Sequence, residues 1–157
     1  PKTVRRQRQM CIRDRYIVQR GLVVDGIEFE LKGKVNDNLD VTFGYTSMDG
    51  KNGTKDAREI PETMYSMWAN YEVNPKLGWA VGVMHQGESL IKDGGTQMLP
   101  DYTRVDAAVY LMLSDDFRLQ VNMENLTDEL YFPHSHSTHQ VSVGRERNIR
   151  LSLTRNF

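Results

Sequence analysis

Three histidines stand close together in one polar stretch of the chain, at His134, His136 and His139. Imidazole nitrogens are common zinc ligands, so the three rings could meet one metal ion if this stretch folded back on itself. No cysteine or carboxylate accompanies them between residues 132 and 139. Structural zinc sites are usually completed by four protein ligands, so we expect no metal here. The stretch is then either a solvated loop or a place where a bound ligand touches the protein.

Two carboxylates form the second group that could do chemistry. If the strands on either side of residues 114–116 pair as a hairpin, Asp106 lies opposite Glu124. Like charges directly opposite each other in a sheet are unfavourable, so a neighbouring cation should compensate them. Arg104 and Arg150 are the candidates for that cation. With arginine beside it and no apolar pocket to tune it, the carboxylate pair is interpreted as structural.

Other patterns that carry enzyme chemistry are missing from the sequence. It contains no nucleophile elbow, no glycine-rich phosphate loop before a helix and no Cys-x-x-Cys, so we expect neither an enzyme nor a cofactor. Cys11 is the single cysteine and cannot form an internal disulfide. The net charge is -1 and basic residues are concentrated only at the start of the chain, which gives no reason to expect nucleic acid.

The elements that must position these side chains are β-strands, because apolar and polar residues alternate with a period of two. From Phe117 to Glu124 every odd residue is apolar and every even one is polar. Comparable strands are expected over residues 26–35, 39–46, 64–73, 79–86, 104–113 and 148–157. Matching apolar rows across the turn at 74–78 lets Tyr71 face Val81. The predicted fold class is all-β, an antiparallel meander of about seven or eight long strands.

The connections between these strands alternate in length. Short ones are expected at residues 36–38, 74–78 and 114–116, and long ones at 48–62, 89–100 and 128–147. Every long connection therefore lies at the same end of the sheet. Outer-membrane barrels have short periplasmic turns and long extracellular loops. The predicted strands, about nine to eleven residues long, also match what a tilted membrane strand needs.

The alternation of apolar and polar residues leaves open which face of the sheet is exposed to water. In a soluble sandwich the apolar row, with Phe29, Val81, Val109 and Leu119, would be buried against a second layer, whereas in a membrane barrel it faces lipid. A lysine or arginine facing lipid at the midplane costs roughly 2 to 4 kcal/mol, so in a barrel the charged row must face the lumen. We expect a luminal charge network of Lys34, Asp40, Arg104, Asp106, Glu124 and Arg150. Lys34 lies opposite Asp40 in it, a favourable cross-strand pair.

Three stretches and the last residue resemble one known family. Leu99–Ala107 reads P-x-Y-T-R-x-D, Asn122–Tyr131 reads N-x-x-N-L-x-D-x-x-Y, and Val143–Arg147 leads into a last strand that ends at Phe157. Together they resemble the C-terminal barrel of TonB-dependent siderophore receptors. The resemblance covers nearly all of the chain after its first residues.

The resemblance implies a transmembrane barrel of about 22 strands in the outer membrane of a Gram-negative bacterium. Such receptors import ferric siderophores with energy passed on by TonB. Residues 15–157 would then be part of the barrel, with the plug domain absent and TonB acting through the missing N-terminal region. Outer-membrane lipid would surround the apolar rows, and Phe157 would be the aromatic end that such barrels present to the barrel assembly machinery.

Under this resemblance the ligand transported is a ferric siderophore, and the candidate contacts are Trp68, Tyr131, His134, His136, His139 and Arg145. Trp68 points into the lumen, where its ring could stack on a catecholate or merely pack on Met84. Arg145 could attract an anionic ferric complex or pair with a nearby carboxylate such as Asp128.

Two questions of identity stay open from the sequence. Residues 9–14 break the alternation and resemble a translated DNA adapter, so we expect residues 1–14 to be a non-native leader, with a natural basic arm as the alternative. For the function, the alternatives to a siderophore receptor are a passive porin-like or adhesin barrel and a soluble β-sheet binding protein. An upstream reading frame that encodes a plug would favour the receptor.

Overall fold

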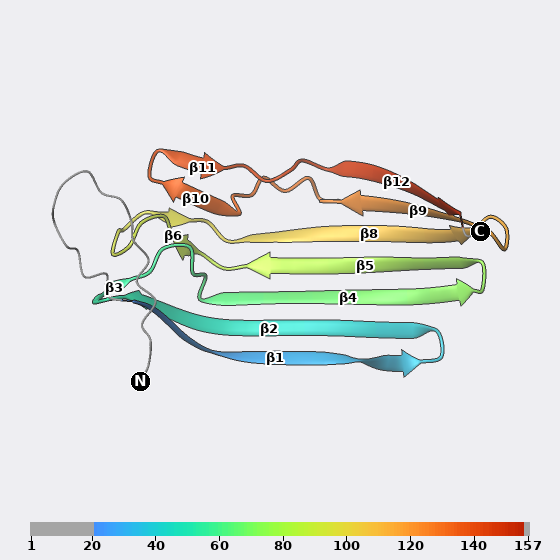
Figure 1. Ribbon diagram of the computed structural model, residues 1–157, viewed down its shortest axis with the longest axis horizontal. Helices are drawn as coiled ribbons and strands as arrows, with labels where there is room; N and C mark the ends of the chain where they lie inside the picture. The colour runs from blue at the N-terminus through green and yellow to red at the C-terminus, as the bar shows by residue number, and fades with distance from the viewer. Residues whose placement is uncertain (1–20, 156–157) are drawn as a thin grey trace, which may run out of the picture.

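The computed structural model describes residues 21–155, which form one antiparallel sheet with two small hairpins at one end (Figure 1). Its long strands, in spatial order, are β1 (Leu22–Asn36), β2 (Leu39–Asn52), β4 (Thr63–Asn74), β5 (Leu77–Gln86), β8 (Tyr102–Met112), β9 (Phe117–Glu124) and β12 (Asn148–Arg155). The short strands are β3 (Lys55–Asp56), which extends the edge of β2, β6 (Ser89–Leu90) paired with β7 (Met98–Leu99), and β10 (His134–Ser137) paired with β11 (Gln140–Ser142). Each long strand neighbours the next one along the chain, which confirms the predicted all-β meander. Within residues 21–155 no helix is long and apolar enough to cross a membrane.

The short turns all lie at one end of the sheet and the long connections at the other (Figure 1). Asparagine side chains close two of the short turns. Asn36 Oδ1 accepts a hydrogen bond from the backbone N–H of Asn38 at 2.9 Å, and Asn74 Oδ1 accepts one from Lys76 N at 2.9 Å and one from Leu77 N at 3.0 Å. Asparagine favours such turns because its side chain replaces a backbone acceptor. The alternation of short and long connections is confirmed.

The register between β4 and β5 differs from the one expected. Tyr71 lies opposite Trp79 and not opposite Val81, with the two ring centroids 5.4 Å apart. Because Asn74 closes a tight turn, β5 begins at Leu77, two residues earlier than the sequence pattern suggested. A shift of two residues keeps every side chain on its face of the sheet, so the assignment of faces survives the error.

The first hairpin is longer than expected. β2 runs to Asn52, inside the long loop predicted at residues 48–62, and pairs there with Leu22 at the start of β1. Its neighbour β4 reaches only as far as the pair of Ser47 with Thr63. The β1–β2 hairpin therefore projects beyond the rest of the sheet at the end that carries the long connections.

The two faces of the sheet differ in the way the alternation predicted. On the apolar face Ile27 is 74% exposed, Phe29 54% and Leu151 69%, and the described residues place no second layer against them. Val81 is 37% exposed. The sandwich interpretation, which needs this row buried, is therefore wrong. β1 and β12 are the two edges of the sheet, so the described residues do not close a barrel.

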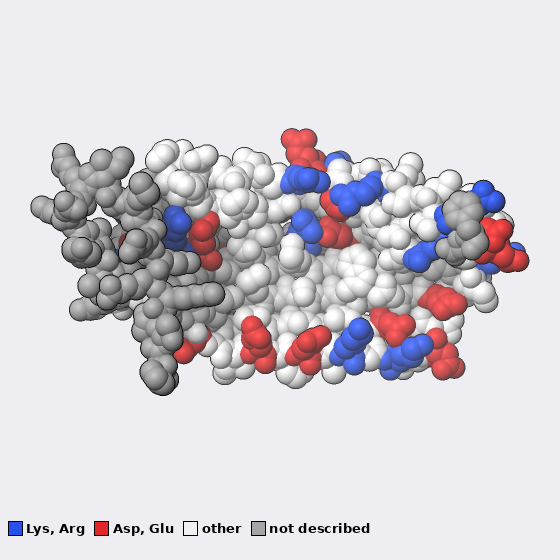
Figure 2. Space-filling view, in the orientation of Figure 1, with Lys and Arg blue, Asp and Glu red and all other residues white. Residues whose placement is uncertain are grey.

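The opposite side, here called the polar face, carries the even-numbered residues of β4, β5, β8 and β9, including Trp68, Gly82, Asp106 and Glu124. Figure 2 shows charged side chains in a row over β1 along the lower edge and in a second group over β8, β9 and β12. The surface between these two groups is largely uncharged.

Candidate functional site

The indole of Trp68 lies at the centre of the polar face, and it is here called the aromatic floor. The register places Trp68 opposite Gly82, and Gly82 opposite Asp106. The indole lies directly over Gly82, since a Cβ there would fall 1.8 Å from Cε3 of Trp68. Trp68 Nε1 also donates a hydrogen bond to Asn70 Oδ1 at 3.0 Å. The ring therefore packs on Gly82, where the absence of a side chain leaves the space.

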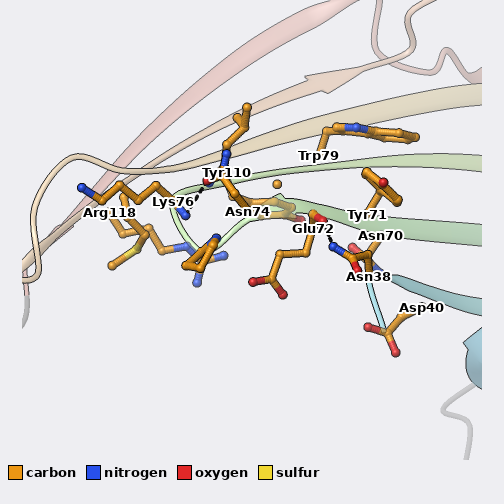
Figure 3. Close-up of a pocket in the computed structure, with 14 residues that line it drawn as sticks. Asn38, Asp40, Asn70, Tyr71, Glu72, Asn74, Lys76, Trp79, Tyr110 and Arg118 are labelled. Atoms are coloured by element: carbon orange, nitrogen blue, oxygen red, sulfur yellow. Dashed lines mark hydrogen bonds between the residues drawn. The ribbon is translucent and has the colours of Figure 1, made fainter. Parts of the chain in front are cut away.

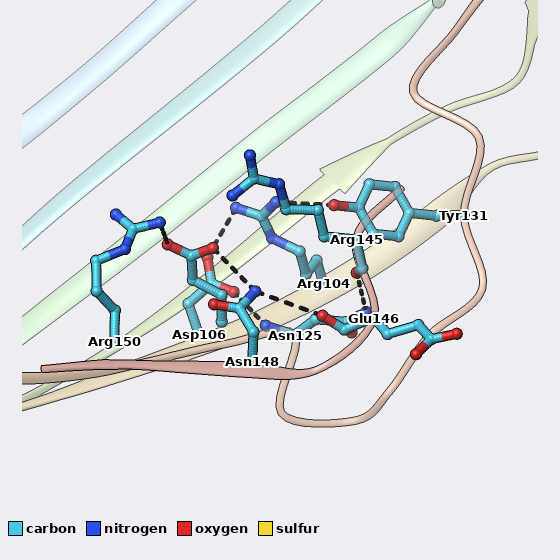
Figure 4. Close-up of polar contacts among 9 residues, drawn as sticks. Arg104, Asp106, Asn125, Tyr131, Arg145, Glu146, Asn148 and Arg150 are labelled. Atoms are coloured by element: carbon cyan, nitrogen blue, oxygen red, sulfur yellow. Dashed lines mark hydrogen bonds and ion pairs between the residues drawn. The ribbon is translucent and has the colours of Figure 1, made fainter. Parts of the chain in front are cut away.

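Two arginine–carboxylate pairs stand beside this floor (Figure 4). Arg104 Nη2 lies 2.8 Å from Asp106 Oδ2, and Arg150 Nη2 lies 3.1 Å from Glu124 Oε1. The predicted compensating cation is present, and each carboxylate has its own. Nε of Arg104 is buried and has no hydrogen-bond partner among the described residues.

Lys34 and Asp40 do not join this network. They are opposite each other in the register of β1 and β2, as predicted. Across the described residues, however, no ion pair forms between them. They lie near the short-turn end of the sheet, so the predicted luminal network divides into two separate arginine–carboxylate pairs and the unbonded pair of Lys34 and Asp40.

Asn125 is the hub of this region, and sequence reasoning did not single it out. It is 1% exposed and has a φ of 54°. Its N–H donates to Asp106 Oδ1 at 2.8 Å, and its Nδ2 donates to the carbonyl oxygens of Glu129 at 2.9 Å and Arg145 at 3.0 Å. Its Oδ1 accepts from Glu129 N at 2.9 Å. The available signal was the second Asn of N-x-x-N-L-x-D, since asparagine tolerates positive φ better than most residues.

Asp128 ties the same connection to the start of β12. It has a φ of 56°, and its Oδ1 accepts a hydrogen bond from Arg147 N at 2.9 Å. The Arg147 guanidinium lies 3.9 Å from Oδ2 of the same carboxylate. Arg145 is exposed, and its backbone carbonyl oxygen accepts a hydrogen bond from Asn125 Nδ2 at 3.0 Å. Among the described residues, Asp128 therefore pairs with Arg147 and not with Arg145.

Tyr131 is buried, which limits its role as a ligand contact. It is 6% exposed, and its ring centroid lies 4.6 Å from that of Tyr102. A Cβ at Gly144 would fall 2.2 Å from the Tyr131 ring, so the two residues are in close contact. Its hydroxyl accepts a hydrogen bond from Arg104 Nη1 at 3.1 Å. The structure thus places Tyr131 as a support for Arg104.

The three histidines do not converge. His134 and His136 are exposed and share one face of β10, because they are two residues apart in a strand. His139 lies in the turn between β10 and β11, with its Nδ1 3.0 Å from Ser137 Oγ. Within residues 21–155, no three histidine, cysteine or acidic side chains are grouped so that they could hold a metal ion.

The long connections contact one another beyond the ends of the strands. Asp93 Oδ1 accepts a hydrogen bond from Arg58 N, and its Oδ2 accepts one from Asn52 Nδ2, both at 2.8 Å. The backbone hydrogen bond from Arg58 is the main reason why the pKa of Asp93 lies below its ordinary value, with the Asn52 bond and the charges of Arg58 and Lys55 adding to it. Asp93, in the connection from β5 to β8, therefore holds the connection from β2 to β4 next to its own.

At the short-turn end the polar side chains surround an open cavity of about 280 Å³ (Figure 3). Asn38 Nδ2 donates to the carbonyl oxygen of Glu72 at 2.7 Å, which joins the β1–β2 turn to β4. Arg118 lies over the ring of Tyr110 with its Cζ 4.9 Å from the centroid. Of the residues predicted from sequence, Asp40 is at this cavity and the ligand candidates are not.

Comparisons with known proteins assign the chain to a family. The family model described as TonB dependent receptor-like, beta-barrel matches residues 10–126. The chain is 27% identical to the probable TonB-dependent siderophore receptor PiuA of Acinetobacter baumannii, over 83% of this chain and 20% of that one. It is 29% identical to the ferrioxamine receptor of Yersinia enterocolitica, over 90% of this chain and 22% of that one.

Solved structures agree on the fold. The crystal structure of the Acinetobacter baumannii siderophore receptor PiuA matches with a TM-score of 0.76 at 24% identity, over 85% of this chain and 22% of that one. The chain thus spans about a fifth of the length of the relatives it matches. With a family model matching from residue 10 to residue 126, the chain belongs to the TonB-dependent receptors and forms part of their β-barrel.

Proposed function

We propose that this chain is a wall segment of an outer-membrane receptor that imports ferric siderophores with energy supplied through TonB. The family lies in the outer membrane of Gram-negative bacteria, which places the chain there. The observation that carries the proposal is the one-sided sheet: Phe29 and Leu151 are more than half exposed on the apolar face, while the arginine–carboxylate pairs lie on the other. The apolar face suits contact with hydrocarbon, whereas the charged groups of the polar face require water.

The polar face supplies two kinds of contact to a ferric complex. The charges of Arg104 and Arg150 are compensated by Asp106 and Glu124, so these residues form a stiff and nearly neutral wall. Arg145, whose carbonyl oxygen is bonded to Asn125, adds an exposed cation that can attract an anionic complex. Ferric iron is the cargo here and not a resident cofactor.

The indole of Trp68 adds an aromatic surface to this wall. Its position over Gly82 and its bond to Asn70 hold the ring in place. His134, His136 and His139 lie among the long connections, at the end where a ligand would arrive. We retain these residues as ligand contacts, and give Tyr131 a supporting role instead.

The partners follow from the same proposal. Lipid surrounds the apolar face, and TonB acts through an N-terminal region of the receptor that precedes this wall segment. The barrel assembly machinery would recognise the last strand through Phe157, which lies outside the described residues, as do residues 1–14 of the predicted leader. Neither the charge nor the fold suggests a nucleic-acid partner.

Uptake of radiolabelled iron tests the proposal in cells that carry or lack the full-length gene. We expect the gene to confer uptake from at least one complex in a panel of hydroxamate and catecholate ferric siderophores, and expect this uptake to stop when TonB is removed. Uptake that continues without TonB would point to a passive porin-like barrel. Absence of uptake from every complex in both strains would refute the siderophore assignment.

A further inference from the structure

The β10–β11 hairpin, which carries the histidines, is attached to the rest of the chain at two places. The first is its base, where Gly144 N donates a hydrogen bond to the carbonyl oxygen of Tyr131 at 2.7 Å. The Tyr131 ring is in close contact with Gly144 and is 6% exposed. Asn125 holds both sides of this base through Glu129 and Arg145. The base is therefore buried and held by several hydrogen bonds.

The second attachment is a pair of exposed side chains from the loop after β3. Arg58 Nη1 donates a hydrogen bond to the carbonyl oxygen of His136, and Glu59 Oε1 accepts one from Ser135 N, both at 2.7 Å. Two adjacent residues thus hold backbone groups of two adjacent residues of β10, the N–H of Ser135 and the carbonyl oxygen of His136. Arg58 and Glu59 together are called the latch. The bonded residues are 78 and 76 positions apart in sequence.

The latch is itself held in an unusual conformation. Glu59 has a φ of 56°, which residues with a Cβ seldom adopt. Its N–H donates to Leu90 O at 2.8 Å, and Arg58 N donates to Asp93 Oδ1 at 2.8 Å. Hydrogen bonds on both sides therefore keep the strained residue pointed at β10. Such local strain is commonly found where a segment is positioned for function.

The buried Ser135, whose N–H is bonded to the latch, shows which side of β10 faces outward. Ser135 is 2% exposed, and its Oγ lies 3.5 Å from the carbonyl oxygen of Ile91, against the neighbouring connection. Side chains alternate along a strand, so His134 and His136 point to the opposite side and are exposed. If the bonds of Ser135 and His136 to the latch were lost, the tip of the hairpin could turn and the histidines would no longer be held outward.

We propose that the β10–β11 hairpin is a flap, hinged at the Tyr131–Gly144 contact and held by Arg58 and Glu59. The two latch residues are positioning residues, which orient His134 and His136 toward an arriving ligand. The part that concerns the ligand rests on the proposed siderophore uptake, whereas the hinge and the latch do not. Two hydrogen bonds from exposed side chains hold the tip, whereas the base is held by the Gly144–Tyr131 backbone bond, the bonds of Asn125 and the buried Tyr131 ring, so the tip opens before the base.

Hydrogen exchange on the full-length receptor tests the latch without any ligand. Loss of a hydrogen bond to a charged group changes an opening equilibrium by about tenfold or more. We therefore expect Glu59→Ala to speed exchange in residues 134–142 by about tenfold, while residues 125–131 keep their protection. Arg58→Ala should act in the same direction. Glu59→Gln keeps an acceptor oxygen and should restore part of the protection.

Glu62→Ala is the matched control, because Glu62 is exposed and belongs to the same connection. It should leave exchange in the hairpin unchanged. Equal exchange in Glu59→Ala and the unaltered receptor would overturn the latch, and so would the same acceleration in Glu62→Ala. Loss of protection in residues 125–131 as well would overturn the hinge.

Titration with ferrioxamine and with a ferric catecholate tests the positioning role. We expect Glu59→Ala to weaken binding several-fold, Glu59→Gln to restore it in part, and Glu59→Ala to have no further effect once His134→Ala and His136→Ala are present. Unchanged affinity in a variant with faster exchange would refute the positioning role. If the unaltered receptor binds neither complex while Glu59→Ala still speeds exchange, the siderophore proposal loses support and the latch stands.

Discussion

Replacing Asn125 by alanine should destabilise the barrel more than any other single polar substitution on this face. The side chain makes three hydrogen bonds, two to Glu129 and one to the carbonyl oxygen of Arg145, and it is 1% exposed. A buried group left without its partner costs about 1 to 3 kcal/mol. Glu129 and Arg145 are exposed and can recruit water, so the low end of that range applies to each bond. We expect a loss of about 3 kcal/mol in the free energy of unfolding.

The positive φ of Asn125 can be separated from its hydrogen bonds. Alanine at a φ of 54° keeps the backbone strain, whereas glycine removes it. Asn125→Gly should therefore be less destabilising than Asn125→Ala by about 1 kcal/mol. The difference between the two variants measures the conformational cost, and the remainder measures the lost hydrogen bonds.

The assay is urea unfolding of the refolded full-length receptor in lipid vesicles, with the folded fraction read from its gel mobility. Asn122→Ala is the control, because Asn122 lies on the same face and its side chain accepts one hydrogen bond, from Gln120 Nε2 at 2.8 Å. It should cost about 1 kcal/mol. The reasoning is refuted if Asn125→Ala is no more destabilising than Asn122→Ala.

Three further outcomes are expected. Gly82→Ala should displace the Trp68 ring, since its new Cβ would fall 1.8 Å from Cε3, and should weaken siderophore binding measured by titration. The pKa of Asp93 is lower in the folded protein than its ordinary value of 3.8, so the contacts of Asp93 are stable above about pH 4 and are lost as the pH falls through the folded pKa. Residues 89–99 should then lose protection from hydrogen exchange in acid, with the rate compared with the intrinsic rate at each pH. Asp93→Asn should remove that dependence. Val81→Lys should cost roughly 2 to 4 kcal/mol of unfolding free energy in vesicles, whereas Thr42→Lys on the polar face should cost much less.

The sequence pattern was sufficient for the features that repeat locally. Alternation with a period of two placed Phe29 and Val81 on one face and Asp106 and Glu124 on the other, and the structure keeps all four there. Even the register error at Tyr71 left this assignment intact, because it was a shift of two residues. A local pattern therefore predicts which face of the sheet a residue lies on more securely than it predicts which residue lies opposite it on the next strand.

The candidate site was predicted less completely. The arginines beside Asp106 and Glu124 were found because a charge conflict between cross-strand neighbours requires a cation. Asn125 was missed as the hub, since its partners Glu129 and Arg145 meet only when the long connection folds back. Tyr131 was named as a ligand contact, and its burial against Tyr102 and Gly144 depends on the same fold of the connection.

By itself, the sequence determined the strands, the alternation of short and long connections, and which residues share a face of the sheet, because each depends on residues that are near one another in the chain. Only the tertiary structure decided that Arg58 and Glu59 hold β10, across 78 and 76 positions, and that Trp68 lies over Gly82. Contacts between residues that are far apart in the chain produce no periodic pattern in the sequence. They depend on the path of each loop, which the surrounding hydrogen bonds determine.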